Sequence, residues 1–211
     1  MATPGEVMQA IGQAYQYVFV GALEASIRPF QNRFHVHTNP EKTTFKGRGG
    51  NSYSFDFNGE YYHPWLHTEV FGECKGYSKG ANLLEEFRCF VAKAYVASVD
   101  YERNRQDLFW FVTNVPFACS EGSGVRNYDF VFSTLRDKKS PQLIDILGGG
   151  HVDERAVRSL VARGTIGSFY PHGQLSQKYR HFIQGWRRRV IVDHSEKAAC
   201  GPIPSWIWFT C

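Results

Sequence analysis

Two acidic residues and a lysine lie in strand-like sequence, and together they could hold a metal ion. Asp56 follows an alternating segment, and Glu73, Cys74 and Lys75 end an apolar one. Two carboxylates form a hard oxygen site that suits Mg²⁺ or Mn²⁺, and the backbone carbonyl of Cys74 can add an oxygen. Such a metal polarises a phosphate and activates its bound water, while Lys75 can position or help to deprotonate that water and offset negative charge. Phosphodiester hydrolysis needs these parts.

The element that carries the first acid is predicted to be a β-strand followed by a tight turn. Residues 52–57 alternate between apolar and polar side chains, with Asp56 on the polar side. Asn58-Gly59 is a strong signal for a two-residue hairpin, after which the chain is expected to return through residues 60–65.

The second acid and the lysine are expected on the next strand, over residues 66–75. A period of two places Glu73 and Lys75 on one face of that strand and Cys74 on the other. The hairpin would then bring Asp56 close to them, at the carboxyl end of a strand, where sites form in open α/β sheets.

Helical and strand periodicities predict the elements around this site. Helices are expected over residues 5–30 and 81–100, and a buried strand over 108–117. A strand, a helix of this length and a buried strand form a βαβ crossover. The remaining expectations are a helical or mixed segment at 127–135, helices at 141–147, 153–163 and 174–186, and short strands at 190–192 and 206–209.

A second acid-x-lysine triplet, Asp137-Lys138-Lys139, shows how little the triplet means alone. Lysine and the acids are common, so one or two such triplets are expected by chance in a chain of this size. Asp137 lies in a polar connection before Ser140-Pro141, which favours a solvated loop. The strand context is what distinguishes Glu73 and Lys75.

The pattern of Asp56, then Glu73-x-Lys75, then a helix resembles the core of the PD-(D/E)xK nucleases, which have the restriction-endonuclease-like fold. The separation of 17 residues between the acids fits that family. More narrowly, the segments "GRGGNSYSFDF" and "VFGECKGYSKG" resemble Mrr-like nuclease domains of bacterial restriction and anti-phage effectors. Phe55 stands where the family motif has a proline, and no Gln-x-x-x-Tyr signature is evident.

The resemblance implies an α/β protein with a mixed central sheet flanked by helices, and a metal-dependent endonuclease that hydrolyses DNA. A nuclease core is expected over residues 1–135, followed by a basic extension over 136–211 packed on the same domain. Members of the family often add a glutamate from the first helix to the metal site. Glu24 and Glu6 are the candidates, and an ordinary surface glutamate is the favoured interpretation of Glu24.

Charge adds an expectation of a polyanionic partner. The net charge is only +4, but residues 155–190 carry eight basic side chains and no acid. Phosphate contacts are predicted, as alternatives to solvated positions, for Lys46, Arg48, Lys79, Arg187, Arg188 and Arg189.

Bulk features place the chain among cytoplasmic proteins. Five widely spaced cysteines without a Cys-x-x-Cys pair disfavour a disulfide framework or a zinc site. No secretory signal or membrane-length apolar run is present. A sensor subunit or sensor domain is expected as a partner, and a homo-oligomer is left open. The alternative function is a non-catalytic nucleic-acid-binding or scaffold module with a decayed site.

Overall fold

The structure is a computed structural model that describes most of the chain and divides it into two compact units. The described residues are 4–26, 30–63, 66–75, 82–101, 107–113, 127–162 and 166–169. One unit comprises residues 1–28 with 171–211, and the other comprises residues 29–170. The boundary expected after residue 135 falls inside the second unit.

The described part of the first unit is one helix, α1, which spans Pro4–Ser26. The helix predicted over residues 5–30 is therefore confirmed, although it ends earlier. Tyr15, Phe19 and Leu23 recur every four residues and are all buried, as an apolar helix face requires. Within the described residues, no helix combines the length and the apolar character that crossing a bilayer demands.

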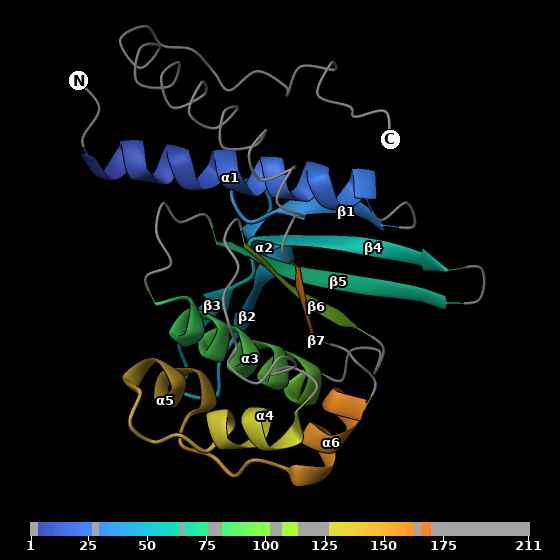
Figure 1. The fold of residues 1–211 in the computed structure, drawn as a ribbon. Helices are drawn as coiled ribbons and strands as arrows, with labels where there is room; N and C mark the ends of the chain where they lie inside the picture. The colour runs from blue at the N-terminus through green and yellow to red at the C-terminus, as the bar shows by residue number, and fades with distance from the viewer. Residues whose placement is uncertain are drawn as a thin grey trace, which may run out of the picture. The chain divides into compact units, whose positions relative to one another are not determined.

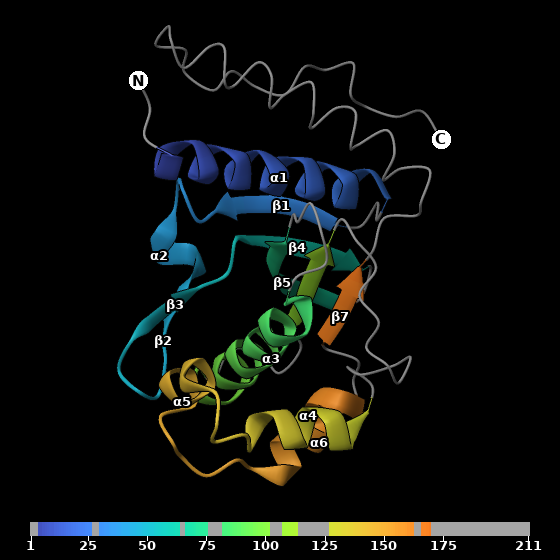
Figure 2. The same ribbon diagram turned by 60° about the vertical axis from the view of Figure 1, so that its left-hand side comes forward.

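The second unit is built on a mixed five-stranded sheet, which confirms the α/β class (Figures 1 and 2). Its order is β1-β4-β5-β6-β7. The first three strands pair antiparallel, whereas β6 is parallel to both of its neighbours. The strand bounds are β1 Phe30–His35, β4 Phe57–His63, β5 Leu66–Lys75, β6 Leu108–Thr113 and β7 Ile166–Phe169.

The hairpin turn predicted at Asn58-Gly59 is wrong, because both residues lie inside β4. Asn58 pairs with Phe71 and Gly59 with Val70, and the β4–β5 pairing continues to His63 opposite Leu66. The chain therefore reverses after His63 and not at Asn58-Gly59. A different constraint requires the glycine: a Cβ at position 59 would lie 2.6 Å from the Gln31 carbonyl oxygen of β1 and against the Phe30 ring.

The crossover predicted after β5 is confirmed. Helix α3 spans Leu83–Asp100 and leads into β6, which pairs parallel to β5 from Val70 opposite Leu108 to Lys75 opposite Thr113. The bounds of β5 match the predicted segment 66–75 at both ends. Strand β6 confirms the predicted strand over residues 108–113, and the rest of that prediction, 114–117, lies outside the described residues.

Aromatic side chains fill the space between the sheet and α3. Phe71 of β5 and Phe109 of β6 stack at 5.9 Å, and Phe55 meets Phe90 of α3 edge-on at 5.9 Å. All four side chains are at most 1% exposed. Since Phe71, Glu73 and Lys75 share one face of β5, this packing places the acid and the lysine at the rim of the core, under α3.

A short segment between β1 and β4 holds three elements, of which the sequence pattern indicated only the strand at Ser52–Ser54. Helix α2 spans Pro40–Thr43, and β2 (Thr44–Lys46) pairs with β3 (Ser52–Ser54) as a separate antiparallel ribbon. Strand β3 confirms the first half of the strand expected over 52–57, but it ends before Asp56, where the chain bends between two sheets.

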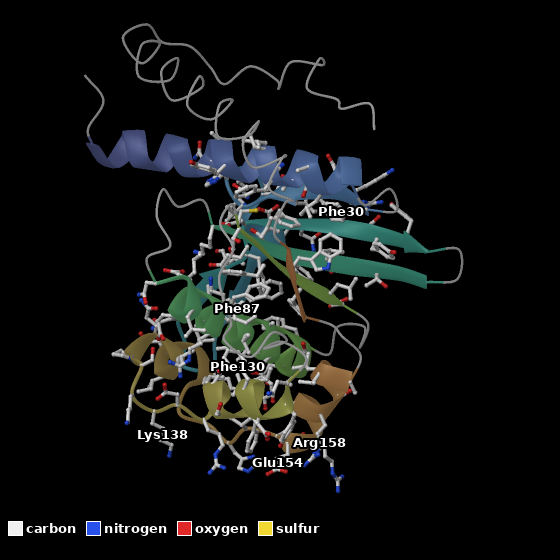
Figure 3. The ribbon with its side chains drawn as sticks, viewed as in Figure 1. Phe30, Phe87, Phe130, Lys138, Glu154 and Arg158 are labelled. Atoms are coloured by element: carbon white, nitrogen blue, oxygen red, sulfur yellow. The ribbon has the colours of Figure 1, made fainter. Side chains whose placement is uncertain are left out.

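Three helices form an outer layer on the same side of the sheet as α3 (Figures 1 and 2). They are α4 (Tyr128–Leu135), α5 (Pro141–Leu147) and α6 (Glu154–Ala162), close to the predicted bounds. Phe130 of α4 stacks on Phe87 of α3 at 6.1 Å (Figure 3). The elements predicted at 174–186, 190–192 and 206–209 lie outside the described residues, whereas β7 joins the sheet from a segment where no strand was expected.

Candidate functional site

The predicted second acid and lysine lie side by side at the carboxyl end of β5, on its α3 face. Lys75 Nζ is 2.7 Å from Glu73 Oε1, which confirms that the two side chains share a face. The Glu73 side chain is 5% exposed, and that of Lys75 is 23% exposed. The carboxylate is therefore almost fully removed from water, while the lysine still reaches solvent.

Asp56 is fixed against the same end of β5 by backbone hydrogen bonds. Its N–H donates to the Gly72 carbonyl at 2.8 Å, and its carboxylate Oδ2 accepts from the Cys74 N–H at 2.7 Å. Its own carbonyl accepts from the Val36 N–H at 3.0 Å. The structure thus brings Asp56 beside Glu73, as predicted, through the antiparallel pairing of β4 with β5.

The Cys74 carbonyl faces the same edge as Asp56. In a β-strand, the N–H and the C=O of one residue point to the same neighbouring strand. Because the Cys74 N–H donates to Asp56 Oδ2, its carbonyl oxygen is directed toward β4 as well. The predicted backbone ligand therefore faces the edge of β5 at which Asp56 lies.

Two residues of α3 that the sequence pattern did not single out complete the cluster. Lys93 Nζ lies 2.9 Å from Glu73 Oε2, and Glu86 Oε2 lies 3.0 Å from Lys75 Nζ. Lys93 also donates to the Ser54 carbonyl at 3.2 Å. Glu73 therefore has a lysine on each oxygen, and Lys75 has a carboxylate on each side.

A signal for Lys93 was present in the sequence. It is the one charged residue in the otherwise apolar run 89–97, on the most buried part of α3. Glu86 lies seven residues earlier, two helical turns away and so on the same face. Only the pairing of α3 with the polar end of β5 distinguishes these residues from ordinary helix charges.

The electrostatics of the two acids differ sharply. Burial, and then the charge of Glu73, raise the pKa of Asp56 to about 6, although the Cys74 N–H and the lysines oppose this shift. Burial also acts to raise the pKa of Glu73, but Lys93 and Lys75 outweigh it and hold that pKa below its usual range. The two acids thus repel each other, and Glu73 keeps its charge because lysines surround it.

The pKa of Lys75 is raised although the side chain is largely buried. Burial alone would lower the pKa, yet Glu73 and Glu86 more than compensate. Lys75 is therefore an ammonium group, suited to stabilising negative charge. Burial raises the pKa of the Cys74 thiol well above its usual range, which keeps that thiol uncharged and leaves only its backbone to take part.

The donor set fits a magnesium-type ion with few protein ligands. Among the described residues, no group of three or more histidine, cysteine, aspartate or glutamate side chains could hold a metal. Mg²⁺ is usually bound through one or two carboxylates together with waters and substrate phosphates. Asp56 and Glu73 supply two carboxylates whose mutual repulsion a divalent cation would relieve.

The predicted third acid stays a prediction. Glu24 lies on α1, in the other compact unit, and each unit is described by itself. Glu6 lies on the same helix, but its side chain is outside the described part of the structure.

The residues predicted to contact nucleic acid lie in different environments. Lys46 is exposed on β2, whereas Arg48 donates to Asp100 at 2.7 and 2.8 Å and lies over the Tyr95 ring at 5.2 Å. Those contacts give Arg48 a structural role, which would compete with a phosphate. Lys79 and Arg187, Arg188 and Arg189 lie outside the described residues.

The second triplet has a structural role. Asp137 pairs with Arg88 of α3 and accepts a hydrogen bond from the Lys139 N–H at 2.8 Å. Its lysines are exposed on the outer layer, where Figure 3 shows Lys138 pointing away from the sheet. The structure therefore keeps this triplet away from Asp56 and Glu73.

The glycine between the core and the site provides a stability test. A Cβ at Gly72 would overlap the ring of Phe57, which is fully buried. We expect Gly72→Ala to lower the free energy of unfolding by about 2 kcal/mol, measured by urea denaturation. Gly150→Ala is the control, because a Cβ there would meet the Leu147 carbonyl at 3.5 Å and the Arg48 side chain at 3.8 Å, which are ordinary contact distances. Equal stabilities of the two variants would contradict this account.

Comparisons with known proteins found only distant likenesses. No protein-family model matches the chain, and no curated protein matches it significantly. One similar solved structure is the Acinetobacter baumannii Cap4 SAVED/CARF-domain containing receptor with the cyclic trinucleotide 3'3'3'-cAAA, at a TM-score of 0.39 and 14% identity over 79% of this chain and 33% of that one. A second structure of that receptor gives 0.38 and 14% over 79% and 34%. The chain spans about a third of the length of that receptor.

Proposed function

We propose that this protein is a metal-dependent endonuclease that hydrolyses DNA, with Asp56, Glu73 and Lys75 as its catalytic residues. The observation that carries the proposal is the pairing of two buried carboxylates: Asp56 is locked beside Glu73, although the charge of Glu73 and burial raise the pKa of Asp56 to about 6. Such repulsion weakens the fold, and perturbed acids of this kind concentrate at functional sites. A divalent cation bound between the two acids would reverse the effect.

Each residue has a defined task in this proposal. Asp56 and Glu73 bind Mg²⁺ or Mn²⁺, and the Cys74 carbonyl contributes an oxygen. The bound ion would polarise the phosphate and activate water. The Lys75 ammonium, which reaches solvent, orients the attacking water and offsets the negative charge that develops on the phosphate.

We also propose that residues 29–170 form a restriction-endonuclease-like core. The order β1-β4-β5-β6-β7, the antiparallel β4–β5 pair that carries the acids and the α3 crossover into β6 support this assignment. A role in restriction or anti-phage defence, and a partnership with a sensor subunit or sensor domain, are proposed from the sequence resemblance alone.

DNA as the substrate is supported by charge. Arg155 and Arg158 of the basic segment 155–190 are exposed on α6, and Figure 3 shows Arg158 on the outer layer. Contacts to phosphates give affinity that does not depend on sequence and that falls steeply with salt.

The test is plasmid nicking with Mg²⁺ and with EDTA. We expect the wild-type protein to nick DNA above the EDTA background, and Asp56→Ala and Lys75→Ala to fall to that background. Lys139→Ala, which changes the lysine of the second triplet, should nick like wild type. Nicking that survives both site substitutions would show that this cluster is not the active site.

One observation favours a second function, that of a non-catalytic nucleic-acid-binding module. Both oxygens of Glu73 are held by lysines, Lys75 at 2.7 Å and Lys93 at 2.9 Å, and such an acid can serve purely as a structural ion-pair partner. Salt-sensitive DNA retention without nicking, in any divalent cation, would favour this alternative.

A further inference from the structure

We infer that Glu86 is a positioning residue that keeps Lys75 in the site when a divalent cation takes Glu73. The inference rests on the proposed function, since it concerns how the same site accepts its metal. It starts from the fact that Glu73 has a lysine within 3.0 Å of each carboxylate oxygen. A metal ion can bind Glu73 only if one of these lysines moves away from the carboxylate oxygen that it contacts.

Lys93 is the lysine that stays. Its side chain is 17% exposed, and its ammonium is also held by the Ser54 carbonyl at 3.2 Å. Away from Glu73 it would keep a neutral carbonyl as its partner in the described structure, and a buried ammonium without a counter-charge is strongly disfavoured.

Lys75 is the lysine that can yield. It lies 2.7 Å from Glu73 Oε1 and 3.0 Å from Glu86 Oε2, so one of its two carboxylates can be lost without leaving it unpaired. The Glu86 side chain is 35% exposed, at the solvent side of the cluster. When a cation takes Oε1, Lys75 remains beside it on Glu86, where the proposed reaction needs an ammonium group.

Glu86 has an ordinary explanation as well, because acids in the first turn of a helix interact favourably with the helix dipole. Its neighbour Glu85 occupies the same turn and provides the comparison. Glu85 pairs with Arg88 at 3.1 Å and accepts from the Ser140 hydroxyl at 2.8 Å, on the side of the outer helices. The two glutamates share the dipole but not the partner, and only Glu86 reaches Lys75.

The test is a double-mutant cycle in Mn²⁺ affinity, measured by titration calorimetry at about 0.15 M salt, where distant charges are screened. We expect Glu86→Gln to weaken Mn²⁺ binding about five-fold, the scale of a partly exposed ion pair at its upper end. Glu85→Gln removes the same charge and should leave the affinity within about two-fold of wild type. Melting curves in EDTA establish that each variant is folded.

The decisive arm places Glu86→Gln in a Lys75→Met background. If Glu86 acts through Lys75, its effect on Mn²⁺ affinity disappears there, since no lysine remains to be held. An equal weakening in both backgrounds would overturn the inference and leave the metal site standing, because Glu86 would then act on the cation directly. Absence of Mn²⁺ binding by the wild-type protein would overturn both the inference and the proposed function.

Discussion

Asp56→Asn is expected to make the protein more stable at pH 8 in EDTA, by up to about 3 kcal/mol, the equivalent of a two-unit pKa shift. Burial and the charge of Glu73 raise the pKa of Asp56 from 3.8 to about 6. Asparagine removes that repelled charge, and its side-chain oxygen can still accept the Cys74 N–H. Urea denaturation of both proteins over a series of pH values measures the difference.

The gain should depend on pH in a defined direction. Below about pH 4, Asp56 is protonated in both the folded and the unfolded chain, and the two proteins should be equally stable. Between pH 4 and pH 6, the unfolded aspartate loses its proton while the folded one keeps it, so the wild-type protein loses stability as the pH rises. Above that window the advantage of Asp56→Asn reaches its full size.

Asp137→Asn is the matched control, and its expected sign is opposite. Hydrogen bonds from the Lys139 N–H and from Arg88 lower the pKa of Asp137. That aspartate therefore contributes stability above its unfolded pKa, which is lost as the pH falls. If Asp56→Asn lowered stability at pH 8 as Asp137→Asn should, Asp56 would be an ordinary structural acid.

The effect of Mn²⁺ on the stability of wild type and of Asp56→Asn tests whether Asp56 also binds metal. A ligand that binds only the folded chain raises its stability, so Mn²⁺ should stabilise the wild-type protein and have little effect on Asp56→Asn. Asp56 would then weaken the fold in the absence of metal and yet be required for metal binding. Such a trade-off between stability and activity is expected at functional sites.

The strongest periodic segments allowed the core of the fold to be predicted from sequence. The apolar run of β5 and the amphipathic face of α3 are long, so their local periodicity is enough to indicate a strand and a helix. The missed strands are short: β2 has three residues and β7 has four. Their pairing depends on distant partners, which a local pattern does not report.

The predicted turn at Asn58-Gly59 is absent, although the acids that it was expected to bring together are neighbours. An Asn-Gly pair favours a turn in isolation, but in β4 it lies opposite Phe71 and Val70, where packing against β1 requires the glycine. Asp56 lies beside Glu73 because the β4–β5 register pairs Phe57 with Gly72, and a turn at Asn58-Gly59 would not produce that register. Lys93 and Glu86 could not be assigned, because the register of α3 over the sheet is set by core packing.

Lys93→Met is expected to lower the free energy of unfolding by about 3 kcal/mol, the lower end of the range for breaking a buried ion pair. Glu73, at 5% exposure, would lose the partner of Oε2 and keep only Lys75, and the Ser54 carbonyl would lose a donor. Methionine preserves the length and the apolar stem of lysine, so packing against the core is retained. For a chain of this size the loss corresponds to a fall in melting temperature of about 9 °C.

Lys138→Met separates this effect from the general loss of a lysine. Lys138 is exposed on the outer layer (Figure 3), and its replacement should change stability by less than about 0.5 kcal/mol. A similarly small change in Lys93→Met would contradict the ion-pair account and make Lys93 as dispensable as a surface lysine.

The double variant Lys93→Met/Glu73→Gln shows why the pair is retained. Removing both charges leaves no uncompensated carboxylate, so the double variant should be more stable than the sum of the two single losses implies, by at least about 1 kcal/mol. Losses that simply add would mean that the two side chains do not interact. A positive coupling would show that Lys93 is present in order to keep Glu73 charged, which is the state that a metal ligand requires.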